Sequence, residues 1–469
     1  MPRQITEKTF FKYIKCPSWV YFDATKEGGA PHHPLLARLA DEGLLQEKER
    51  ELVKDRPDVV EVTAEDPEEA FRQTVSFMRD GRETIYRGLL LDGHWVGHPD
   101  VLIKVEGRSR FGNYYYVAAD VKRSREVRDD FKFQGCFYAE LLERIQGTKP
   151  TQGYVITPDG VALTYQIEEF ESAYKLTLDE IERIVAGEKP PHFLTSGCKQ
   201  SPWFSECRCE SESCNDLSIL NRVWREEVSA LREAGITTID ELAALPVPEL
   251  EGRASDLRIM RLELLHTQAR AIRDGKHIVL KRLELPETEI ELYLDIESDP
   301  LRDLDYLFGI LEVNEGKETY HSFFAENADE QGKMWAEFCV FVESHMDAPM
   351  YHYGWYELEV VRRFEARYGA PAFAREALAR NMIDLLSVIR PAIAFPLSFY
   401  SLKDLAQYIG FEWRAVDASG ANSVLWFEGW LKTKDKRTLQ KIFEYNEDDV
   451  RATHALKQWA WEQAGPYSA

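Results

Sequence analysis

An alternation of apolar and polar residues predicts two adjacent β-strands in the N-terminal part of the chain. Residues 95–105 and 114–121 are β-type runs, and the segment between them, EGRSRFGN, is typical of a turn. Because successive side chains of a strand point to opposite faces, Asp120 and Lys122 lie on one face of the second run. With Asp100 on the preceding run, the pattern brings together two carboxylates and an ammonium group. Such a set can hold a divalent metal and stabilise charge on a phosphate.

An amphipathic helix is predicted directly after these strands. Gln134 and Tyr138 are four residues apart, so both lie on the same face of this helix. The alternative interpretation of the whole stretch is a salt bridge at a strand end followed by an ordinary helix, since exposed ion pairs are common and weak. Neighbouring patterns predict strands over 59–62 and 153–156 and helices over 34–54, 67–79 and 174–186.

A second alternating pattern begins after Pro286 and predicts the first strand of a new domain. It reads TEIELYLDIESDP, and Asp295 and Glu297 are neighbours on the face opposite to the isoleucine and leucine side chains. Two like charges this close are costly without a counter-ion. A D-x-E pair alone is more often a solvated strand edge than a metal site. Further acidic residues elsewhere in the chain are needed to indicate a metal site.

Two later segments add acidic residues to this pair. In MYHYGWYELEVVRR, a strand and a turn are followed by a helix that carries Glu357 in its first turn. In FEYNEDDVRA, Tyr445 and Asp449 lie four residues apart on one helix face. Asp384 begins another helical run, and we interpret it as a helix N-cap. Together with the D-x-E pair, these segments supply four candidate acids and one tyrosine.

The chain between the two strand patterns is helical. Residues 216–250 predict a helix, a turn at Gly235, and a second helix that is capped by Thr238 and ended by Pro246. The pair resembles a helix-hairpin-helix unit, in which turn amides hold a nucleic-acid backbone. A plain helical hairpin that bridges two domains is the alternative. A longer helix is predicted over 255–274.

Composition and charge narrow the class of protein. The 469 residues are 44% hydrophobic, enough to fill the cores of about two to four domains. The net charge of −23 argues against broad, nonspecific coating of nucleic acid, although local basic groups can still line a groove. No apolar run approaches the roughly 18 residues of a membrane helix, and MPRQITEKTFFKYIKC lacks the apolar region of a signal peptide. We therefore expect a cytoplasmic protein without a membrane partner.

Most of the seven cysteines crowd into one short segment. In a cytoplasmic chain such crowding indicates metal binding, for example of zinc, rather than disulfides. The alternative is a purely structural role. Cys16 stands alone near the N-terminus, while Cys136 and Cys339 belong to apolar helical patterns and are predicted core residues. The crowded residues are Cys198, Cys207, Cys209 and Cys214.

The first set of motifs, Gly-x-x-Asp, a hairpin, Asp-x-Lys and Gln-x-x-x-Tyr, resembles the PD-(D/E)xK nuclease core of the RecB family. A histidine on an earlier helix often supplies a further metal ligand in that family. Gln46 stands in the expected place here, and the neighbouring Glu47 is the residue that could substitute. The resemblance implies metal binding by Asp100 and Asp120, assistance to the attack by Lys122, and a DNA-facing helix that carries Gln134 and Tyr138.

The second set, Asp-x-Glu, a middle acid and Tyr-x-x-x-Asp, resembles the DEDD exonucleases of the RNase H-like fold, in their Tyr subtype. In that family four acids hold two metal ions about 3.5–4 Å apart, and the tyrosine helps to position the water. The segment SFYSLKDLAQYIGFEW also resembles the region of this fold before its last motif. Glu357 departs from the family, in which an aspartate is usual. The ligands implied are Asp295, Glu297, Glu357 and Asp449, with Tyr445 as the positioning residue.

The cysteine segment resembles the iron–sulfur site of some RecB-like nucleases, including CRISPR-associated exonucleases. There one cysteine precedes the nuclease core and three follow it in the spacing C-x2-C-x5-C. Ser201 occupies one of these positions here, and a serine oxygen is a poor iron–sulfur ligand. The resemblance leaves three alternatives: an iron–sulfur cluster, a zinc ion or a lost site. The residues implied are Cys16, Cys198 and Cys207, with Cys209 or Cys214 as the fourth ligand.

Read together, the motifs resemble a family of bacterial proteins that joins a RecB-like nuclease to an RNase H-like exonuclease. We expect an α/β protein with a restriction-endonuclease-like (PD-(D/E)xK) domain and cysteine segment over 1–215, a helical bridge over 216–285 and an RNase H-like DEDD domain over 286–469. The implied function is a Mg²⁺- or Mn²⁺-dependent DNA exonuclease of repair, recombination or defence. It would act on single strands or duplex ends, with a helicase as a partner. The alternatives are a nucleic-acid-binding adaptor with degenerate sites and an RNA 3′ exonuclease.

Overall fold

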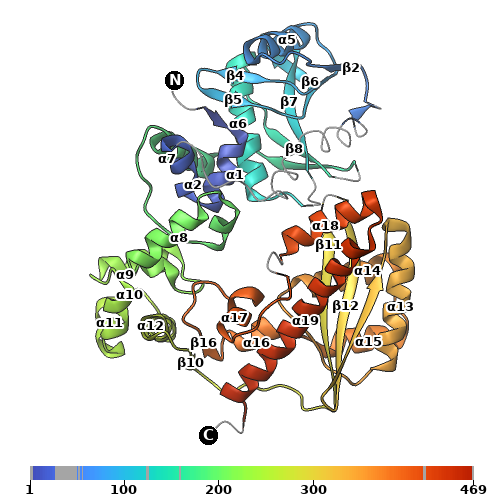
Figure 1. The fold of residues 1–469 in the computed structure, drawn as a ribbon. Coiled ribbons are helices and arrows are strands. Elements are labelled where there is room, and N and C mark those ends of the chain that lie inside the picture. The colour runs from blue at the N-terminus through green and yellow to red at the C-terminus, as the bar shows by residue number, and fades with distance from the viewer. Residues whose placement is uncertain are drawn as a thin grey trace. The chain divides into compact units, whose positions relative to one another are not determined.

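The chain divides into two compact units in the computed structural model (Figure 1), one ending at Glu210 and the other beginning at Ser211. The predicted helical bridge therefore belongs to the same unit as the predicted RNase H-like domain. Independent folding of three domains stays a prediction. None of the described helices combines the length and the apolar composition that crossing a membrane requires. The structure describes residues 4–26, 50, 53–54, 56–122, 126–157, 160–300, 302–415 and 419–466.

The first unit contains a mixed sheet of six strands. Its strands are β2 (Val59–Glu61), β3 (Thr84–Tyr86), β6 (Val101–Ser109), β7 (Gly112–Val121), β8 (Gln152–Ile156) and β9 (Ala162–Gln166), in the order β2-β3-β6-β7-β8-β9. The central strands β6 and β7 are antiparallel, whereas β7 and β8 are parallel. A smaller sheet has the order β1-β5-β4 and consists of β1 (Ile5–Thr6), β4 (Leu90–Asp92) and β5 (Trp95–Gly97).

Helices cover the large sheet of this unit, and its central helix is α6 (Asp129–Gln146), which packs on β7 and β8. Tyr116 of β7 joins Phe137 of this helix in the main core. The other face of β7 packs Ala119 and Val121 into a smaller cluster. The predicted alternation of β7 between two faces is therefore confirmed. The remaining helices are α1 (Glu7–Lys15), α2 (Pro17–Thr25), α5 (Pro67–Arg79), α7 (Glu171–Val185) and α8 (Phe204–Ser213).

The predicted strand over 95–105 is wrong, because the structure splits it into two. Strand β5 ends at Gly97 and joins the small sheet, while β6 begins at Val101 and joins the large one. Pro99 lies in the break, and a proline has no N–H to donate to a strand ladder. The hairpin of β6 and β7 also extends into the predicted turn, with an irregular register between Glu106 and Ser109.

The second unit is built on a five-stranded sheet. Its strands are β11 (Ile290–Asp299), β12 (Leu304–Asn314), β13 (Lys317–Phe324), β14 (Met350–His352) and β15 (Met382–Asp384), in the order β13-β12-β11-β14-β15. The first three strands are antiparallel to one another, whereas β14 and β15 add in parallel. The order places the centre of β11 in the middle of the sheet.

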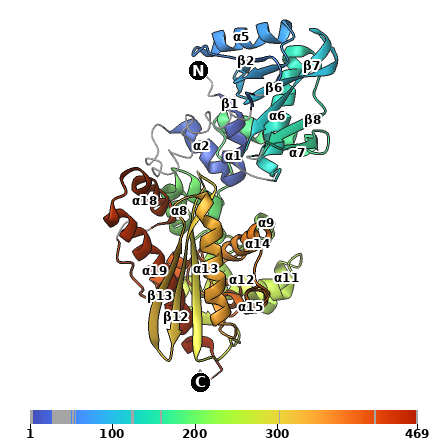
Figure 2. The same cartoon turned by 90° about the vertical axis from the view of Figure 1, so that its right-hand side faces the viewer.

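Helices cover both faces of this sheet, as Figure 2 shows for α13 (Gln331–Ser344) and α19 (Lys436–Ala464). Leu292, Leu294 and Ile296 face the core beneath α13. Tyr293 points to the opposite core, to which α19 contributes. The predicted alternation of β11 is therefore confirmed, and its acidic residues lie on the face of α19. The other helices around the sheet are α14 (Tyr356–Tyr368), α15 (Ala372–Asn381), α16 (Leu385–Ile389), α17 (Leu402–Tyr408) and α18 (Gly420–Thr433).

Short helices precede the sheet of the second unit. They are α9 (Arg225–Glu233), α10 (Ile239–Ala244), α11 (Val247–Arg253) and α12 (Ile259–Asp274). Gly235 has a φ of +77° between the first two, and the Thr238 side chain caps α10 by accepting from the Glu241 amide. Helix α10 does end before Pro246, at Ala244, but Pro246 is also the N-cap residue of α11. Strand β10 (Ile278–Val279) then pairs with β16 (Ile393–Ala394).

Candidate functional site

Three carboxylates meet on the face of the sheet that α19 covers. Asp295 and Glu297 come from β11, and Asp449 comes from α19. One ligand oxygen of each lies within 4.8 Å of the others. Among the described residues, no other acidic trio comes this close. We call these three residues the acid trio.

A missing side chain on the neighbouring strand makes room beside Asp295. Gly309 pairs with Asp295 across β11 and β12, and a Cβ at this glycine would lie 1.5 Å from Oδ1 of Asn446. Asn446 donates from Nδ2 to Oδ2 of Asp295 at 2.7 Å. Its Oδ1 accepts a hydrogen bond from the Tyr320 hydroxyl at 2.8 Å. Gly309 therefore allows Asn446 to reach Asp295 and fix the orientation of its carboxylate.

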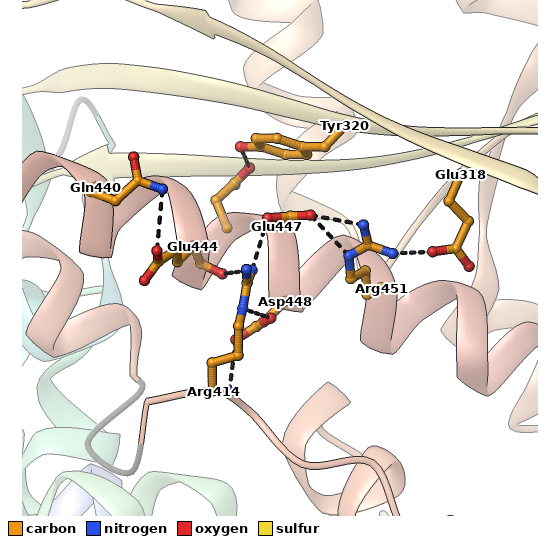
Figure 3. Close-up of polar contacts among 9 residues, drawn as sticks. Glu318, Tyr320, Arg414, Gln440, Glu444, Glu447, Asp448 and Arg451 are labelled. Atoms are coloured by element: carbon orange, nitrogen blue, oxygen red, sulfur yellow. Dashed lines mark hydrogen bonds and ion pairs between the residues drawn. The ribbon is translucent and has the colours of Figure 1, made fainter.

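Asp449 is oriented by a segment that crosses α19. Nε1 of Trp413 donates to Oδ1 of Asp449 at 2.6 Å. The next residue, Arg414, binds Oδ1 of Asp448 at 2.7 Å and Oε2 of Glu447 at 2.9 Å, as Figure 3 shows. These ion pairs hold the segment on the helix. Asp448 precedes Asp449 in the sequence, but its carboxylate is paired with Arg414 and does not belong to the trio.

The trio is costly to ionise in the absence of a cation. Burial and the charge of Asp449 raise the pKa of Glu297 to about 8. Burial also raises the pKa of Asp449 to about 6, although hydrogen bonds from Trp413 and Tyr445 act in the opposite direction. Burial and the neighbouring carboxylates raise the pKa of Asp295 well above its usual value. Carboxylate oxygens are the donors that Mg²⁺ and Mn²⁺ prefer, so the trio fits a divalent metal that would relieve this repulsion.

One basic side chain and one tyrosine accompany the trio. Burial lowers the pKa of Lys403, while the charges of Asp449 and Glu297 raise it. The Lys403 ammonium lies 5.4 Å from the ring centre of Trp413 and 5.6 Å from that of Tyr445. Burial raises the pKa of Tyr445 well above its usual value, and the acids raise it further. The tyrosine hydroxyl therefore stays protonated, and it donates its hydrogen bond to Asp449.

Glu357 lies near the trio but not within it. It is a buried residue in the first turn of α14, and its charge is among the causes that raise the pKa of Asp295. Its Oε2 lies 3.6 Å from Nδ1 of His352. Within the part of the chain that the structure describes, neither of these two buried atoms has a hydrogen-bond partner. A buried carboxylate oxygen without a hydrogen-bond partner among the described residues, whose charge acts on Asp295, agrees with a further contribution to metal binding.

Asp384 is a helix cap, as its sequence context indicates. Its Oδ1 accepts hydrogen bonds from the amide of Leu386 at 3.0 Å and from the amide of Gly354 at 2.8 Å. The carboxylate thus caps α16 and fixes the turn before α14. It supports the backbone near Glu357 rather than joining the trio.

The residues of the first predicted site also meet, at the end of β7. Lys122 lies 3.0 Å from Oδ2 of Asp120. Oδ1 of Asp120 accepts from the Asp100 amide at 3.1 Å, and Oδ2 of Asp100 accepts from the Val121 amide at 2.7 Å. Burial lowers the pKa of Lys122, but the two carboxylates outweigh it and raise the pKa overall. The two acids and the lysine therefore form one charged group.

Helix α6 brings Gln134 and Tyr138 close to this group. Nε2 of Gln134 donates to the Tyr138 hydroxyl at 2.9 Å, and that hydroxyl donates to the carbonyl oxygen of His98 at 3.2 Å. Burial, Asp120 and Glu7 raise the pKa of Tyr138. Glu7 is a buried acid on α1 that the sequence patterns missed, and its Oε2 accepts from the His98 amide at 3.2 Å. Gln46 and Glu47, the predicted positions for a further ligand, lie outside the described residues.

Three of the predicted cysteine ligands are buried together. Cys16, Cys198 and Cys207 interact with one another through their thiols. Sγ of Cys198 also accepts from the Thr195 amide at 3.3 Å. The two candidates for the fourth ligand, Cys209 and Cys214, are exposed. A four-cysteine cluster therefore fits only in part, because the buried group contains three thiols.

Several residues around the trio were missed by pattern reasoning. Asn446 and Trp413 each donate to a carboxylate of the trio, while Lys403 carries the neighbouring positive charge. All three belong to segments that the sequence patterns mark, FEYNEDDVRA and SFYSLKDLAQYIGFEW. For Asn446 the available signal was its position three residues before Asp449, on the same helical face. Nothing in the linear sequence shows which tryptophan reaches which acid.

Comparison with known proteins bears on the second unit. Residues 292–461 match the sequence model of a family described as the RNase_H superfamily. The match includes the acid trio and every strand of the five-stranded sheet except the first two residues of β11. A search of curated proteins gives no match. The match supports an RNase H-like region with a nuclease-type activity in the C-terminal part of the chain.

Proposed function

We propose that the protein is a metal-dependent nuclease that hydrolyses phosphodiester bonds of DNA at the acid trio. The observation that carries the proposal is the approach of three carboxylates to within 4.8 Å of one another in a mostly buried site. Such an arrangement is unfavourable alone and becomes favourable around divalent cations. Its location within the RNase H-like region agrees with this chemistry.

The residues of the site have different roles in hydrolysis. Asp295, Glu297 and Asp449 would hold Mg²⁺ or Mn²⁺, with Glu357 contributing from α14. When bound, these ions supply an activated water and stabilise the leaving oxygen. The Tyr445 hydroxyl donates to Asp449, so its oxygen would orient the water as a hydrogen-bond acceptor.

The side chains that hydrogen-bond to the trio orient its carboxylates before a substrate binds. Asn446 and Trp413 hold two of the acids in fixed orientations, so little reorganisation is needed when a phosphate arrives. The ammonium group of Lys403 interacts electrostatically with Glu297 and Asp449, so it would also attract a phosphate oxygen at the trio. Removing a supporting hydrogen bond of this kind typically costs 10- to 100-fold in metal affinity or activity (about 1–3 kcal/mol).

We propose a second nuclease site in the first unit, formed by Asp100, Asp120 and Lys122. It is supported by the short contacts among these three residues and by their resemblance to a RecB-like PD-(D/E)xK core. The pair Gln134 and Tyr138 would then lie on the DNA side of α6. Two sites of different kinds in one chain would suit exonucleolytic processing of single strands or duplex ends in repair, recombination or defence. A helicase that exposes single strands is the partner this role implies.

A set of variants separates the contributions of the two sites. Single- and double-stranded DNA are incubated with Mg²⁺ or Mn²⁺ and with the wild type, Asp120→Ala, Asp295→Ala or the double variant. Each single variant is expected to abolish the products of its own site. The exposed Asp329→Ala serves as the control for loss of an acidic side chain. Wild-type cleavage by the double variant would reject the catalytic role of both sites.

Two other functions predict different results. An adaptor with degenerate sites would bind nucleic acid but show no Mn²⁺ binding that depends on Asp295. An RNA 3′ exonuclease would degrade an RNA oligonucleotide faster than a DNA oligonucleotide of the same sequence. The departure from the family at Glu357 is the feature that favours the adaptor, because one extra methylene group shifts the carboxylate relative to an aspartate.

The buried thiols offer a separate proposal of zinc or iron binding. Cys16, Cys198 and Cys207 join the first helical segment of the chain to the segment around α8. Elemental analysis of anaerobically purified protein tests this proposal, with Cys198→Ser as the matched variant. Colourless protein that contains neither iron nor zinc would reject it.

A further inference from the structure

We propose that Arg222 and Arg390 form a phosphate-binding pair that guides a single nucleic-acid strand toward the acid trio. The proposal deepens the proposed function and rests on it, because it names contacts that would hold the strand to be cleaved. Both residues belong to the second unit, one in the segment before α9 and one directly after α16.

The two arginines interact electrostatically, and the ion pairs found within the described residues include neither of them. Burial and the charge of Arg222 lower the pKa of Arg390, so the guanidinium groups repel each other. Nε of Arg390 is buried and has no hydrogen-bond partner within the described residues. Asp384 is the acid that acts on Arg390, and its Oδ1 already accepts two backbone amides. An anion that binds both guanidinium groups would relieve the repulsion.

The backbone around Arg222 is held in an unusual conformation. Its φ is +55°, which a side chain with a Cβ rarely adopts. The preceding Asn221 donates from Nδ2 to the carbonyl oxygen of Ser398 at 3.1 Å. Arg261 donates to the carbonyl oxygen of Arg222 at 2.7 Å and forms an ion pair with Glu227. These contacts stabilise the conformation and leave the Arg222 side chain exposed.

A short segment connects this pair to the acid trio. Arg390 acts electrostatically on Tyr353 and Tyr400, and the Tyr353 hydroxyl donates to the Tyr400 carbonyl oxygen at 2.8 Å. Three residues beyond Tyr400, Lys403 interacts with the charges of Glu297 and Asp449. Segment 398–403 therefore accepts a hydrogen bond from Asn221 at one end, through Ser398, and interacts electrostatically with the trio at the other, through Lys403.

Exposed tryptophans accompany the basic residues. Trp224 is 61% exposed and stands two residues after Arg222, and Trp355 is 70% exposed and stands two residues before Glu357. Large aromatic side chains are seldom this exposed without a partner. Arginines contact phosphates and aromatic rings stack on bases in proteins that bind single strands. In a chain with a net charge of −23, this combination favours a single strand over a duplex.

Binding measured without cleavage tests the proposal. A fluorescent single-stranded oligonucleotide, as DNA and as RNA of the same sequence, is titrated in EDTA with full-length protein carrying Asp295→Asn. In this background, Arg222→Gln and Arg390→Gln are each expected to weaken binding. Each should also reduce the slope of log K against log salt by about 0.7, the value for one phosphate contact on a single strand. Arg390→Lys should retain the charge and recover part of the binding.

The matched control is Arg375→Gln, which removes an arginine that is already paired with Glu365. It should leave both affinity and slope unchanged. Thermal unfolding of each variant identifies loss of folding, and the exposed Arg222 provides a variant that leaves the core intact. Tighter binding of one polymer identifies it as the preferred strand.

Three results separate this proposal from the proposed function. Binding and salt slopes that are unchanged in both arginine variants would overturn the proposed pair, even if Asp295-dependent cleavage is observed. Absence of any strand binding would overturn it as well. Binding that depends on the arginines in a protein without cleavage would instead reject the nuclease and leave the pair in place.

Discussion

At the scale of single residues, the acid trio depends on side chains that are not acidic. Asp295 is oriented by Asn446, and Asn446 fits only because residue 309 is glycine. Asp449 is oriented by the indole of Trp413. Carboxylates held in this way have little freedom to turn away from one another, so their repulsion is retained until a cation binds.

Gly309→Ala tests this arrangement. The new Cβ would lie 1.5 Å from Oδ1 of Asn446, so Asn446 must move and its hydrogen bond to Asp295 is lost. We expect a destabilisation of about 1–3 kcal/mol and roughly tenfold weaker Mn²⁺ binding, measured by denaturation and metal titration. Gly429→Ala in α18 is the control, because nothing lies within 4 Å of its added Cβ. That substitution should stabilise by about 0.5–1 kcal/mol, and equal effects of the two would contradict the account.

The raised pKa of Glu297 leads to a prediction of how the free energy of unfolding depends on pH in the absence of metal. Its pKa rises from 4.5 to about 8 on folding. Because the folded state favours the protonated carboxyl, the contribution of Glu297 to the free energy of unfolding is complete below about pH 4.5. It is lost as the pH rises through about 8. In EDTA, the free energy of unfolding should therefore fall by up to about 1.4 kcal/mol per pH unit in this window.

Glu297→Gln is the comparison for this measurement. Glutamine does not titrate, so the variant should lose less stability than the wild type between pH 5 and pH 8, and Mn²⁺ should remove much of the loss in the wild type. Chemical denaturation at several pH values measures both curves. Parallel curves for the two proteins would show that Glu297 does not titrate as proposed.

At the scale of elements, the strands and helices that carry the acids were predictable. Alternation in β11 predicts its two faces, and the spacing of Tyr445 and Asp449 predicts their common helix face. The break at Pro99 was missed because apolar residues on both sides of it suggested one strand, although Gly97, His98 and Pro99 interrupt them and a proline cannot donate to a strand ladder. The contact of Trp413 with Asp449 was also unpredictable, because it depends on how segment 411–415 crosses α19.

Trp413→Phe tests the role of this crossing segment. Phenylalanine keeps an aromatic ring for Phe411 and Lys403 but lacks the N–H that donates to Asp449. We expect cleavage activity to fall 10- to 100-fold (about 1–3 kcal/mol) with little change in folding. Cleavage rates and thermal unfolding measure the two effects. Wild-type activity would show that Asp449 is oriented by other contacts.

At the scale of the whole molecule, the helical segment before the sheet is part of the second unit. Strand β10 pairs with β16, and the Leu283 amide donates to the Ala464 carbonyl oxygen at 2.7 Å. Leu283 is also buried in the core beneath α19. The contacts of β10 and Leu283 could not be predicted from the sequence. Pro286 is typical of a domain boundary, yet the residues before it pack onto the sheet that follows it.

Two fragments test this organisation. Residues 211–469 should fold and bind Mn²⁺, whereas residues 286–469 should be less stable by at least about 2 kcal/mol, since burial of Leu283 alone contributes that much. Denaturant unfolding of both fragments measures the difference. Equal stability would show that the helical segment and its connection act only as a linker.

The most direct measurement for the whole account is the rate at which the acid trio cleaves a labelled single strand in Mn²⁺. The Asp120→Asn protein, in which the first site is disabled, is compared with Asp120→Asn/Asp295→Asn, with EDTA as the blank. We predict cleavage by the first protein and at least a 100-fold lower rate for the second (about 2.7 kcal/mol or more). Equal rates for the two proteins, or no cleavage by the first, would contradict the assignment of the acid trio as a metal-dependent nuclease site.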